Sequence, residues 1–146
     1  MKIVIATDHN GVNEKEAIIN NLKENYTIID KSPNNTPTDD YPVYAIEVAK
    51  YVSENEDSLG ILLCGTGIGM SIAANKVKGI RAARCVDVDD AFYAKNHNSA
   101  NIICLSSNIE LNYLFEIIDT FINTKSAEEE KHINRVNKII KYEQGS

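Results

Sequence analysis

Apolar runs and helix-spaced apolar residues alternate along the chain. Short runs rich in β-branched residues predict buried strands, beginning with the run from Lys2 to Thr7. Between these runs, apolar residues return every three or four positions, which predicts helices that each bury one face. The predicted strands cover residues 2–7, 27–30, 61–63, 80–86 and 101–105. The predicted helices begin near residues 13, 41, 71, 87, 111 and 126.

The alternation of strands and helices defines the predicted architecture. Five strands joined by helical connections predict a parallel sheet covered on both faces, which is a doubly wound, Rossmann-like α/β fold. Two helices are predicted after the last strand, so we expect the second of them to be an extra C-terminal helix. With 146 residues and no internal repeat, the chain is predicted to form a single domain over residues 1–146.

Local signals mark where several helices begin and end. Asn13 with Glu16, and Ser126 with Glu129, have the spacing of capping boxes. Gly79 is placed to cap the C-terminus of the third predicted helix. The second predicted helix is expected to turn an apolar face toward the sheet, made of Ala45, Ile46, Ala49 and Val52.

A glycine-rich loop, Cys64-Gly65-Thr66-Gly67-Ile68-Gly69, joins a predicted strand to a predicted helix. Glycines at alternate positions allow a tight turn and let a ligand approach the backbone closely. The unpaired N–H groups and the positive dipole end of the following helix favour an anion there. The loop therefore predicts an anion-binding site with a thiol at its edge. A tight turn that merely buries a cysteine is the alternative.

Three common anion-binding motifs do not fit this loop. The dinucleotide fingerprint needs G-x-G-x-x-G after the first strand, and here the third glycine comes one residue early. A P-loop needs Lys after its last glycine, but Met70 follows Gly69. Met70 also stands where a C-x-x-x-x-x-R phosphatase loop has its arginine. What remains is an anion site with a cysteine nucleophile or base.

Polar residues at another strand end are predicted to join this loop. Asp8 and His9 directly follow the first strand, and the carboxyl ends of parallel strands meet at one edge of a sheet. We therefore expect both residues to converge with Cys64, which has the chemistry of a nucleophile or a general base. His97 is expected in a turn before the last strand, as a further candidate for the site. The alternative is that His97 is an exposed loop histidine without a function.

The last predicted helix carries two features with two interpretations each. Lys131 and Arg135 lie four positions apart, which places them on one face as either a solvated surface or a phosphate clamp. Ile133, Val136 and Ile140 form an apolar stripe. We expect this stripe to pack against a second subunit, with packing on its own domain as the alternative.

Composition and charge narrow the function classes. Hydrophobic residues make up 43% and charged residues 25% of the chain, as in ordinary soluble globular proteins. The net charge of −6 argues against a nucleic-acid partner. No apolar run has membrane-spanning length and no signal peptide is visible, so we expect a cytoplasmic protein without a membrane partner. Cys64, Cys85 and Cys104 form no C-x-x-C pair, so neither a metal site nor a disulfide is predicted. Cys85 and Cys104 lie in apolar runs and are expected in the core.

Several short motifs occur in combination along nearly the whole chain. They are Asp8-His9, Asp40-Tyr41-Pro42, the loop from Cys64 to Ser71, Asn75-Lys76, Gly79-Ile80-Arg81-Ala82, His97-Asn98, and Lys131-His132 with Arg135-Val136. In this combination the chain resembles type B ribose-5-phosphate isomerases, a family that includes the galactose-6-phosphate isomerase subunits. The resemblance implies an aldose–ketose isomerase of the pentose phosphate pathway that interconverts ribose 5-phosphate and ribulose 5-phosphate through an enediolate.

The same resemblance implies roles for individual residues. Cys64 would be the general base that moves the proton between C1 and C2, and His97 would donate a proton when the furanose ring opens. Asp8 would contact hydroxyl groups at the reacting end of the sugar, and Thr66 with the loop N–H groups would hold the enediolate oxygen. The implied substrate-binding residues are Asp8, His9, Tyr41, Gly65, Thr66, Gly67, Ile68, Gly69, Ser71, Asn98, Lys131 and Arg135.

The resemblance further implies a homodimer or homotetramer with its active site between two subunits, and no metal or organic cofactor. His9, Lys131 and Arg135 would bind the phosphate group. The chain departs from the family at Lys131 and Asn108, where the family usually has arginine, so bidentate contacts are lost there. An isomerase of allose or galactose 6-phosphate, and a non-catalytic phosphometabolite-binding domain, are the alternatives.

Overall fold

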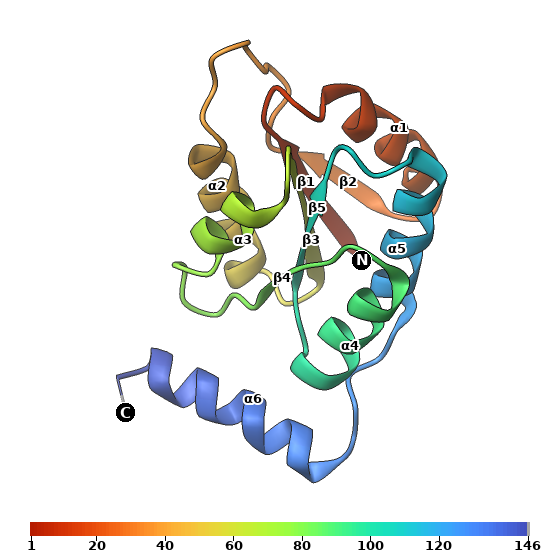
Figure 1. The fold of residues 1–146 in the computed structure, drawn as a ribbon. Coiled ribbons are helices and arrows are strands. Elements are labelled where there is room, and N and C mark those ends of the chain that lie inside the picture. The colour runs from red at the N-terminus through yellow and green to blue at the C-terminus, as the bar shows by residue number, and fades with distance from the viewer. Residues whose placement is uncertain (146) are drawn as a thin grey trace.

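The sheet in the computed structural model, which describes residues 1–145, has five parallel strands in the order β2-β1-β3-β5-β4 (Figure 1). Neighbouring strands pair in parallel throughout, which confirms the predicted doubly wound architecture. The strand order reverses between β1 and β3, and ligands of such sheets bind beyond the carboxyl ends at this point. The strands are β1 (Lys2–Thr7), β2 (Thr27–Asp30), β3 (Ser58–Cys64), β4 (Ala82–Arg84) and β5 (Ile102–Ser106).

Helices cover both faces of the sheet, and each face has its own apolar layer. Side chains such as Ile61 and Leu105 pack toward α1, α4 and α5, whereas Leu62 and Cys104 pack toward α2 and α3. This alternation follows from the two-residue period of a strand. The helices are α1 (Val12–Leu22), α2 (Tyr41–Glu54), α3 (Ile68–Ala74), α4 (Val88–Asn98), α5 (Leu111–Asn123) and α6 (Glu130–Glu143).

The third helix differs from its prediction at both ends. It begins at Ile68 rather than at residue 71, because Gly67 takes a left-handed φ of 78° directly after the strand and starts the helix early. The helix is capped by Asn75, not by Gly79. The Asn75 side chain bridges to β4, donating to the carbonyl of Ala82 at 2.8 Å and accepting from its N–H at 2.8 Å.

The two predicted capping boxes are not formed. Helix α1 begins after Gly11 without a side-chain cap, and α6 begins after Glu129, also without one. Ser126 lies ahead of α6, and its hydroxyl instead accepts from the hydroxyl of Ser99 at 2.9 Å. By contrast, Asp87 caps α4, which begins where predicted, because the Asp87 carboxylate accepts from the Asp90 N–H at 2.7 Å.

The last helix lies outside the layers around the sheet and packs mainly against α4 (Figure 1). Only part of the predicted apolar stripe is covered in one chain: Val136 is buried, but the side chain of Ile133 is 44% exposed. His132, rather than an apolar residue, is the second buried position of this helix. The expectation that Ile46 faces the sheet is also wrong, because it is exposed while Val48 is buried.

Candidate active site

The carboxyl ends of β1 and β3 enclose the predicted chemical site. Asp8, Cys64 and Thr66 line an open cleft of about 440 Å³ together with residues of α2 and α3. The predicted convergence of the first strand end with the glycine loop is therefore confirmed for Asp8, whereas His9 does not line this cleft. The other residues that line the cleft are Tyr41, Gly65, Ile68, Gly69 and Ile72.

Cys64 is the last residue of β3, and its side chain is almost fully buried. The N–H of Gly67 donates a hydrogen bond to the Cys64 Sγ at 3.1 Å. A backbone donor directed at sulfur stabilises negative charge on that atom. The Cys64 sulfur is therefore held by a backbone donor of the glycine loop, at the cleft that Cys64 itself lines.

The loop that follows Cys64 is held from both sides of the sheet edge. The Arg84 Nε of β4 donates to the Thr66 carbonyl at 2.9 Å. The Ser106 hydroxyl of β5 and the Asn108 amide both donate to the Gly65 carbonyl, at 2.7 and 3.1 Å. No sequence pattern singles out Arg84 or Ser106, although the pairing of Cys64 with Ser106 follows once the strand register is known.

Two glycines of the loop are required by close contacts. A Cβ on Gly67 would lie 3.1–3.2 Å from backbone atoms of Cys104 and Leu105, in addition to its left-handed φ. A Cβ on Gly69 would lie 2.5 Å from the ring of Tyr41. Tyr41 therefore closes one side of the cleft by packing its ring on the bare backbone of α3.

Asp8 lies beside the loop in a fixed orientation and is 5% exposed. One carboxylate oxygen accepts from the Asn10 N–H at 2.9 Å, and the other accepts from the Asn10 side-chain amide at 3.2 Å. These bonds form an Asx-type turn that holds the carboxylate at the end of β1. A hydroxyl-bearing ligand in the cleft would meet an acceptor whose position is set before binding.

His9 forms a pair with Asp39 that the sequence did not reveal. Both the N–H and the Nδ1 of His9 bond to the same Asp39 Oδ1, each at 2.9 Å. This hydrogen bond with Asp39 raises the pKa of His9. Burial opposes ionisation of Asp39, but hydrogen bonds from Asn35, His9, Thr36 and Tyr44 hold the pKa of its carboxyl well below the usual range.

His97 lies far from Cys64 within one chain. It belongs to the last turn of α4, so its predicted position in a turn is wrong. The helix continues to Asn98 because Ser99 takes the left-handed conformation, with φ 48°, and caps it. Helix α4 ends ahead of β5, whereas Cys64 pairs with the last residue of that strand, Ser106. The end of α4 and Cys64 are therefore separated by the length of β5, which is about 13 Å for a five-residue strand.

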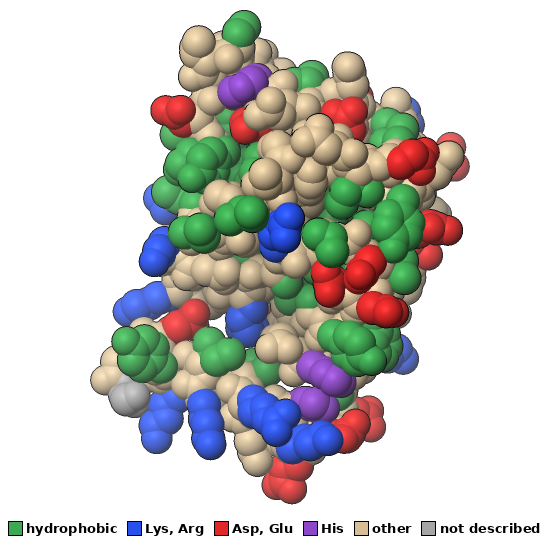
Figure 2. Space-filling view, in the orientation of Figure 1, with side chains coloured by type: hydrophobic (Ala, Val, Ile, Leu, Met, Phe, Trp, Pro, Cys, Tyr) green, Lys and Arg blue, Asp and Glu red, His purple; other side chains and the backbone are tan. Residues whose placement is uncertain are grey.

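His97 instead belongs to a second cluster on α4 and α6. Its ring stacks on that of His132, with centroids 4.0 Å apart and planes at 13°, and Tyr93 lies at 4.8 Å on a tilted plane. Burial and the neighbouring His97 lower the pKa of His132. Lys131 and Arg135 flank His132 on an α6 face along which Lys and Arg side chains gather (Figure 2). Two of the three histidines thus lie together, away from His9.

A single chain therefore presents the predicted site residues in two groups. The first group lies at the carboxyl ends of β1 and β3. Asp8, Tyr41, Gly65, Thr66, Ile68 and Gly69 line the cleft, whereas His9, Gly67 and Ser71 lie close to them in the chain and do not line it. The second group lies at the end of α4 and on α6 and contains His97, Asn98, Lys131 and Arg135.

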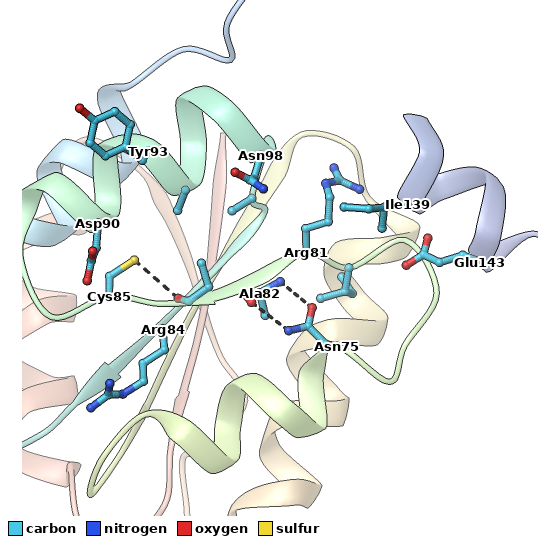
Figure 3. A pocket seen from close by; sticks show the side chains of 14 residues that line it. Asn75, Arg81, Ala82, Arg84, Cys85, Asp90, Tyr93, Asn98, Ile139 and Glu143 are labelled. Carbon is cyan, nitrogen blue, oxygen red and sulfur yellow. Dashed lines mark hydrogen bonds between the residues drawn. The ribbon is translucent and has the colours of Figure 1, made fainter. Parts of the chain in front are cut away.

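A larger hollow, of about 490 Å³, lies between β4, α4 and α6 (Figure 3). Asn98, Arg81 and Glu143 line it, and its only thiol is that of Cys85. Burial, together with nearby Asp90 and Asp87, raises the pKa of Cys85 to about 12. This thiol stays protonated near neutral pH, so the smaller cleft at Cys64 is the better candidate for the reacting centre.

Neither a metal site nor a membrane span is found in the part of the chain that the structure describes. Within residues 1–145, no three or more His, Cys, Asp and Glu side chains are grouped as metal ligands would be. In the same residues, every helix is too short or too polar to cross a membrane.

Comparison with known proteins places the chain among sugar-phosphate isomerases. A sequence model described as Ribose/Galactose Isomerase matches residues 3–139. The chain belongs to this family. It is 44% identical over 144 residues to a probable ribose-5-phosphate isomerase B of Mycoplasma pneumoniae, covering 97% of this chain and 94% of that protein. It is also 37% identical to the galactose-6-phosphate isomerase subunit LacB of Clostridium acetobutylicum, with coverage of 99% and 87%.

Solved structures of this family share the fold in detail. Ribose-5-phosphate isomerase B from Mycoplasma genitalium, determined with bound ribulose 5-phosphate, superimposes with a TM-score of 0.94 at 42% identity and covers 99% of this chain and 97% of that one. The Clostridium thermocellum enzyme superimposes with a TM-score of 0.93 at 40% identity, and 99% of each chain is covered.

Proposed function

We propose that this chain, acting as one sugar-phosphate isomerase domain, interconverts ribose 5-phosphate and ribulose 5-phosphate through an enediolate. The observation that supports this most directly is the Cys64 thiol, which ends a strand in a ligand-sized cleft and accepts a backbone hydrogen bond. The relatives named ribose-5-phosphate isomerase B support the choice of a pentose phosphate. Its setting would be the pentose phosphate pathway in the cytoplasm.

Cys64 is the general base of the proposed reaction. As a thiolate it takes the proton from C2 of the open-chain aldose, and the carbonyl oxygen at C1 becomes an enediolate oxygen. The N–H groups of the loop and the hydroxyl of Thr66 stabilise that oxygen as charge develops on it. The thiol then returns the proton to C1 while the hydroxyl proton at O2 passes to the oxygen at C1, and the ketose results. Asp8 accepts a hydrogen bond from a sugar hydroxyl at the reacting end.

The remaining groups of the site come from a partner subunit in this proposal. His97 of the partner subunit donates the proton that opens the furanose ring, and Asn98 of the partner subunit binds a hydroxyl group. The separation of His97 from Cys64 within one chain supports this arrangement. So does α6, whose Ile133 and Ile139 are 44% and 43% exposed in a single chain. We therefore propose a homodimer or a larger homo-oligomer.

The phosphate group is bound by His9 together with Lys131 and Arg135 in the same proposal. Lys131 acts as a point charge, whereas Arg135 has the geometry for two parallel bonds. Removing one charge-assisted contact costs about 1.5–3 kcal/mol. Arg135→Ala should therefore mainly raise KM for the sugar phosphate.

A coupled assay tests the reaction and its substrate. Purified protein with a chelator present should convert ribose 5-phosphate, and kcat/KM should be lower for allose 6-phosphate and galactose 6-phosphate. Unphosphorylated ribose should be a poor substrate, because the phosphate supplies the binding energy that positions C1 and C2. A preference for either hexose phosphate would replace the pentose assignment, and no turnover of any of them would leave a phosphometabolite-binding domain.

A mixing experiment tests whether two subunits share each site. Inactive Cys64→Ala and His97→Asn variants are unfolded together and refolded at equal amounts. If the site lies between two subunits, each mixed dimer regains one intact site, and about one quarter of wild-type activity returns. If Cys64 and His97 act within one chain, the mixture stays inactive and the shared site is refuted.

A further inference from the structure

The carboxylate of Asp39 is surrounded by donors from three parts of the chain. Besides the two bonds to His9, it accepts from the Asn35 amide at 2.9 Å, the Thr36 N–H at 3.0 Å and the Tyr44 hydroxyl at 3.0 Å. Its side chain is 9% exposed, whereas that of His9 is 40% exposed. Such a saturated carboxylate has little freedom to move, so the imidazole bound to it is also held in place.

The same network fixes His9 relative to the cleft. The Asn35 amide that donates to Asp39 also donates to the Thr7 carbonyl at 2.8 Å. Thr7 is the last residue of β1 and precedes Asp8. The loop before α2 is thereby tied to the end of β1, which Asp8 and His9 directly follow, and Asp39 sets where the His9 ring lies.

The geometry also determines which nitrogen is available to a ligand. With Nδ1 bonded to Asp39, only Nε2 of His9 remains for a ligand. In the neutral ring that keeps its hydrogen on Nδ1, Nε2 carries a lone pair and repels an anionic oxygen. In the imidazolium, Nε2 carries a hydrogen and donates to that oxygen. Anion binding by His9 therefore requires the charged ring.

We propose that Asp39 is a positioning residue that orients His9 and keeps it as an imidazolium, so that its Nε2–H is available to the phosphate group of the substrate at neutral pH. This rests on the proposed function in one respect, namely that the ligand carries a phosphate. The groups that face His9 are Asp8 from the end of β1 and Asp39 from the loop before α2, while Tyr44 of α2 reaches it only through Asp39. Both facing groups are acidic, and both raise the pKa of His9.

Histidine-labelled protein tests the first half of this proposal by NMR titration. The three histidines are assigned with the help of a His9→Gln variant. In wild type, His9 should titrate above the ordinary value of about 6.5. In Asp39→Asn, which removes the charge but keeps the shape, its titration should move to lower pH. Asp40→Asn is the matched control, because it removes the same charge one residue along from an exposed side chain and should leave the His9 titration in place.

Sulfate binding tests the second half, because sulfate stays a dianion over the whole pH range in which a histidine can titrate. Wild-type affinity should be highest at low pH and should fall as pH rises through the His9 pKa. At a pH between the His9 midpoints that the NMR titration gives for the two proteins, Asp39→Asn should bind sulfate more weakly, by up to about tenfold for one charge-assisted hydrogen bond. The difference should narrow as pH falls below the His9 midpoints of both proteins, because the ring is then charged in both.

The outcomes separate a positioning role from a structural one. A loss of affinity in Asp39→Asn that is equal at all pH values would show a structural role only and would overturn the proposal. An unchanged His9 titration in Asp39→Asn would overturn it as well. If Asp39→Asn does not fold, His9→Gln decides: its sulfate affinity should lose the pH dependence that wild type shows, and retention of that dependence contradicts the proposal. Neither measurement needs turnover, so the role of Asp39 can be tested even in a protein that has no isomerase activity.

Discussion

Gly67→Ala is the substitution that most directly tests how the loop controls Cys64. Gly67 has a φ of 78°, and its N–H donates to the Cys64 Sγ at 3.1 Å. An added Cβ would lie 3.1 Å from the Leu105 carbonyl carbon and 3.2 Å from the Cys104 oxygen. These are backbone atoms of a central strand, so they cannot move aside as a flexible side chain would.

The magnitude follows from two costs. A left-handed backbone at a residue with a Cβ costs about 1–2 kcal/mol. Forcing a methyl group into this tight contact adds about 1–3 kcal/mol. The free energy of unfolding should therefore fall by about 2–5 kcal/mol, which a protein of ordinary stability survives. Because the loop must shift to relieve the contact, the hydrogen bond to Cys64 lengthens, and kcat should fall by about 10–100-fold.

Three measurements on the same preparation check this reasoning. Urea denaturation gives the loss in free energy of unfolding, and the coupled isomerase assay gives kcat. The rate of Cys64 alkylation against pH shows whether the thiolate has become harder to form, which should appear as a shift of the profile to higher pH. Burial raises the pKa of Cys85 to about 12 and that of Cys104 well above its usual range, so the fast phase of alkylation should report Cys64, which lines the cleft.

Gly65→Ala is the matched control for the stability measurement. Its Cβ would meet only the Asn10 amide nitrogen, at 3.9 Å, and its φ lies outside the left-handed region. Its unfolding free energy should stay within about 1 kcal/mol of wild type. If Gly67→Ala is as stable as Gly65→Ala and its alkylation profile is unchanged, the strained turn does not control the thiol and the reasoning is wrong.

Three further predictions concern the chemistry and the stability of the scaffold. Cys64→Ala should lower kcat in the coupled assay by about 10²–10⁴-fold with the fold intact by circular dichroism, and a near wild-type kcat would exclude Cys64 as the base. Lys15 is 2% exposed and bonds to the Ser32 carbonyl at 2.7 Å and the Asp30 carboxylate at 2.9 Å. Lys15→Met should therefore cost about 1.5–3 kcal/mol in urea denaturation, and a change below about 0.5 kcal/mol would show that this network contributes little. Asp87→Ala removes the α4 cap and should cost about 1 kcal/mol by thermal melting, with no loss expected if water replaces the carboxylate.

Elements that depend on local chemistry were determined by the sequence itself. The bounds of β1 and β2 agree with the apolar runs, because a strand in a parallel sheet that is covered on both faces is a short continuous run of apolar, β-branched residues. Helix α2 begins at Tyr41 as predicted, since Pro42 fits a first helical turn and no later one. The convergence of Asp8 with Cys64 also followed from the sequence, because the carboxyl ends of neighbouring parallel strands must meet.

Other features needed contacts that no local pattern encodes. The early start of α3 depends on how Gly67 packs against the β5 backbone, and Asn75 ends that helix because it can bridge to Ala82. Helix α4 extends through His97 because the N–H groups of Ser99 and Ala100 still find carbonyls in the helix. For α3 the competing local signal was weaker than a tertiary contact or hydrogen bond, whereas α4 is extended by the hydrogen bonds of its own C-terminal end.

Two properties of the candidate site were decided by tertiary structure alone. Asp39 is 30 residues from His9, and the sequence shows only one more acid in a polar loop, so its partner appears only when the loop folds back onto the end of β1. His97 and Cys64 looked like members of one site, but α4 ends at the opposite end of β5 from Cys64. The sequence identifies the reactive groups, because their chemistry depends on the residue type alone. The distance between them depends on the length of a strand and on the end at which the chain enters it.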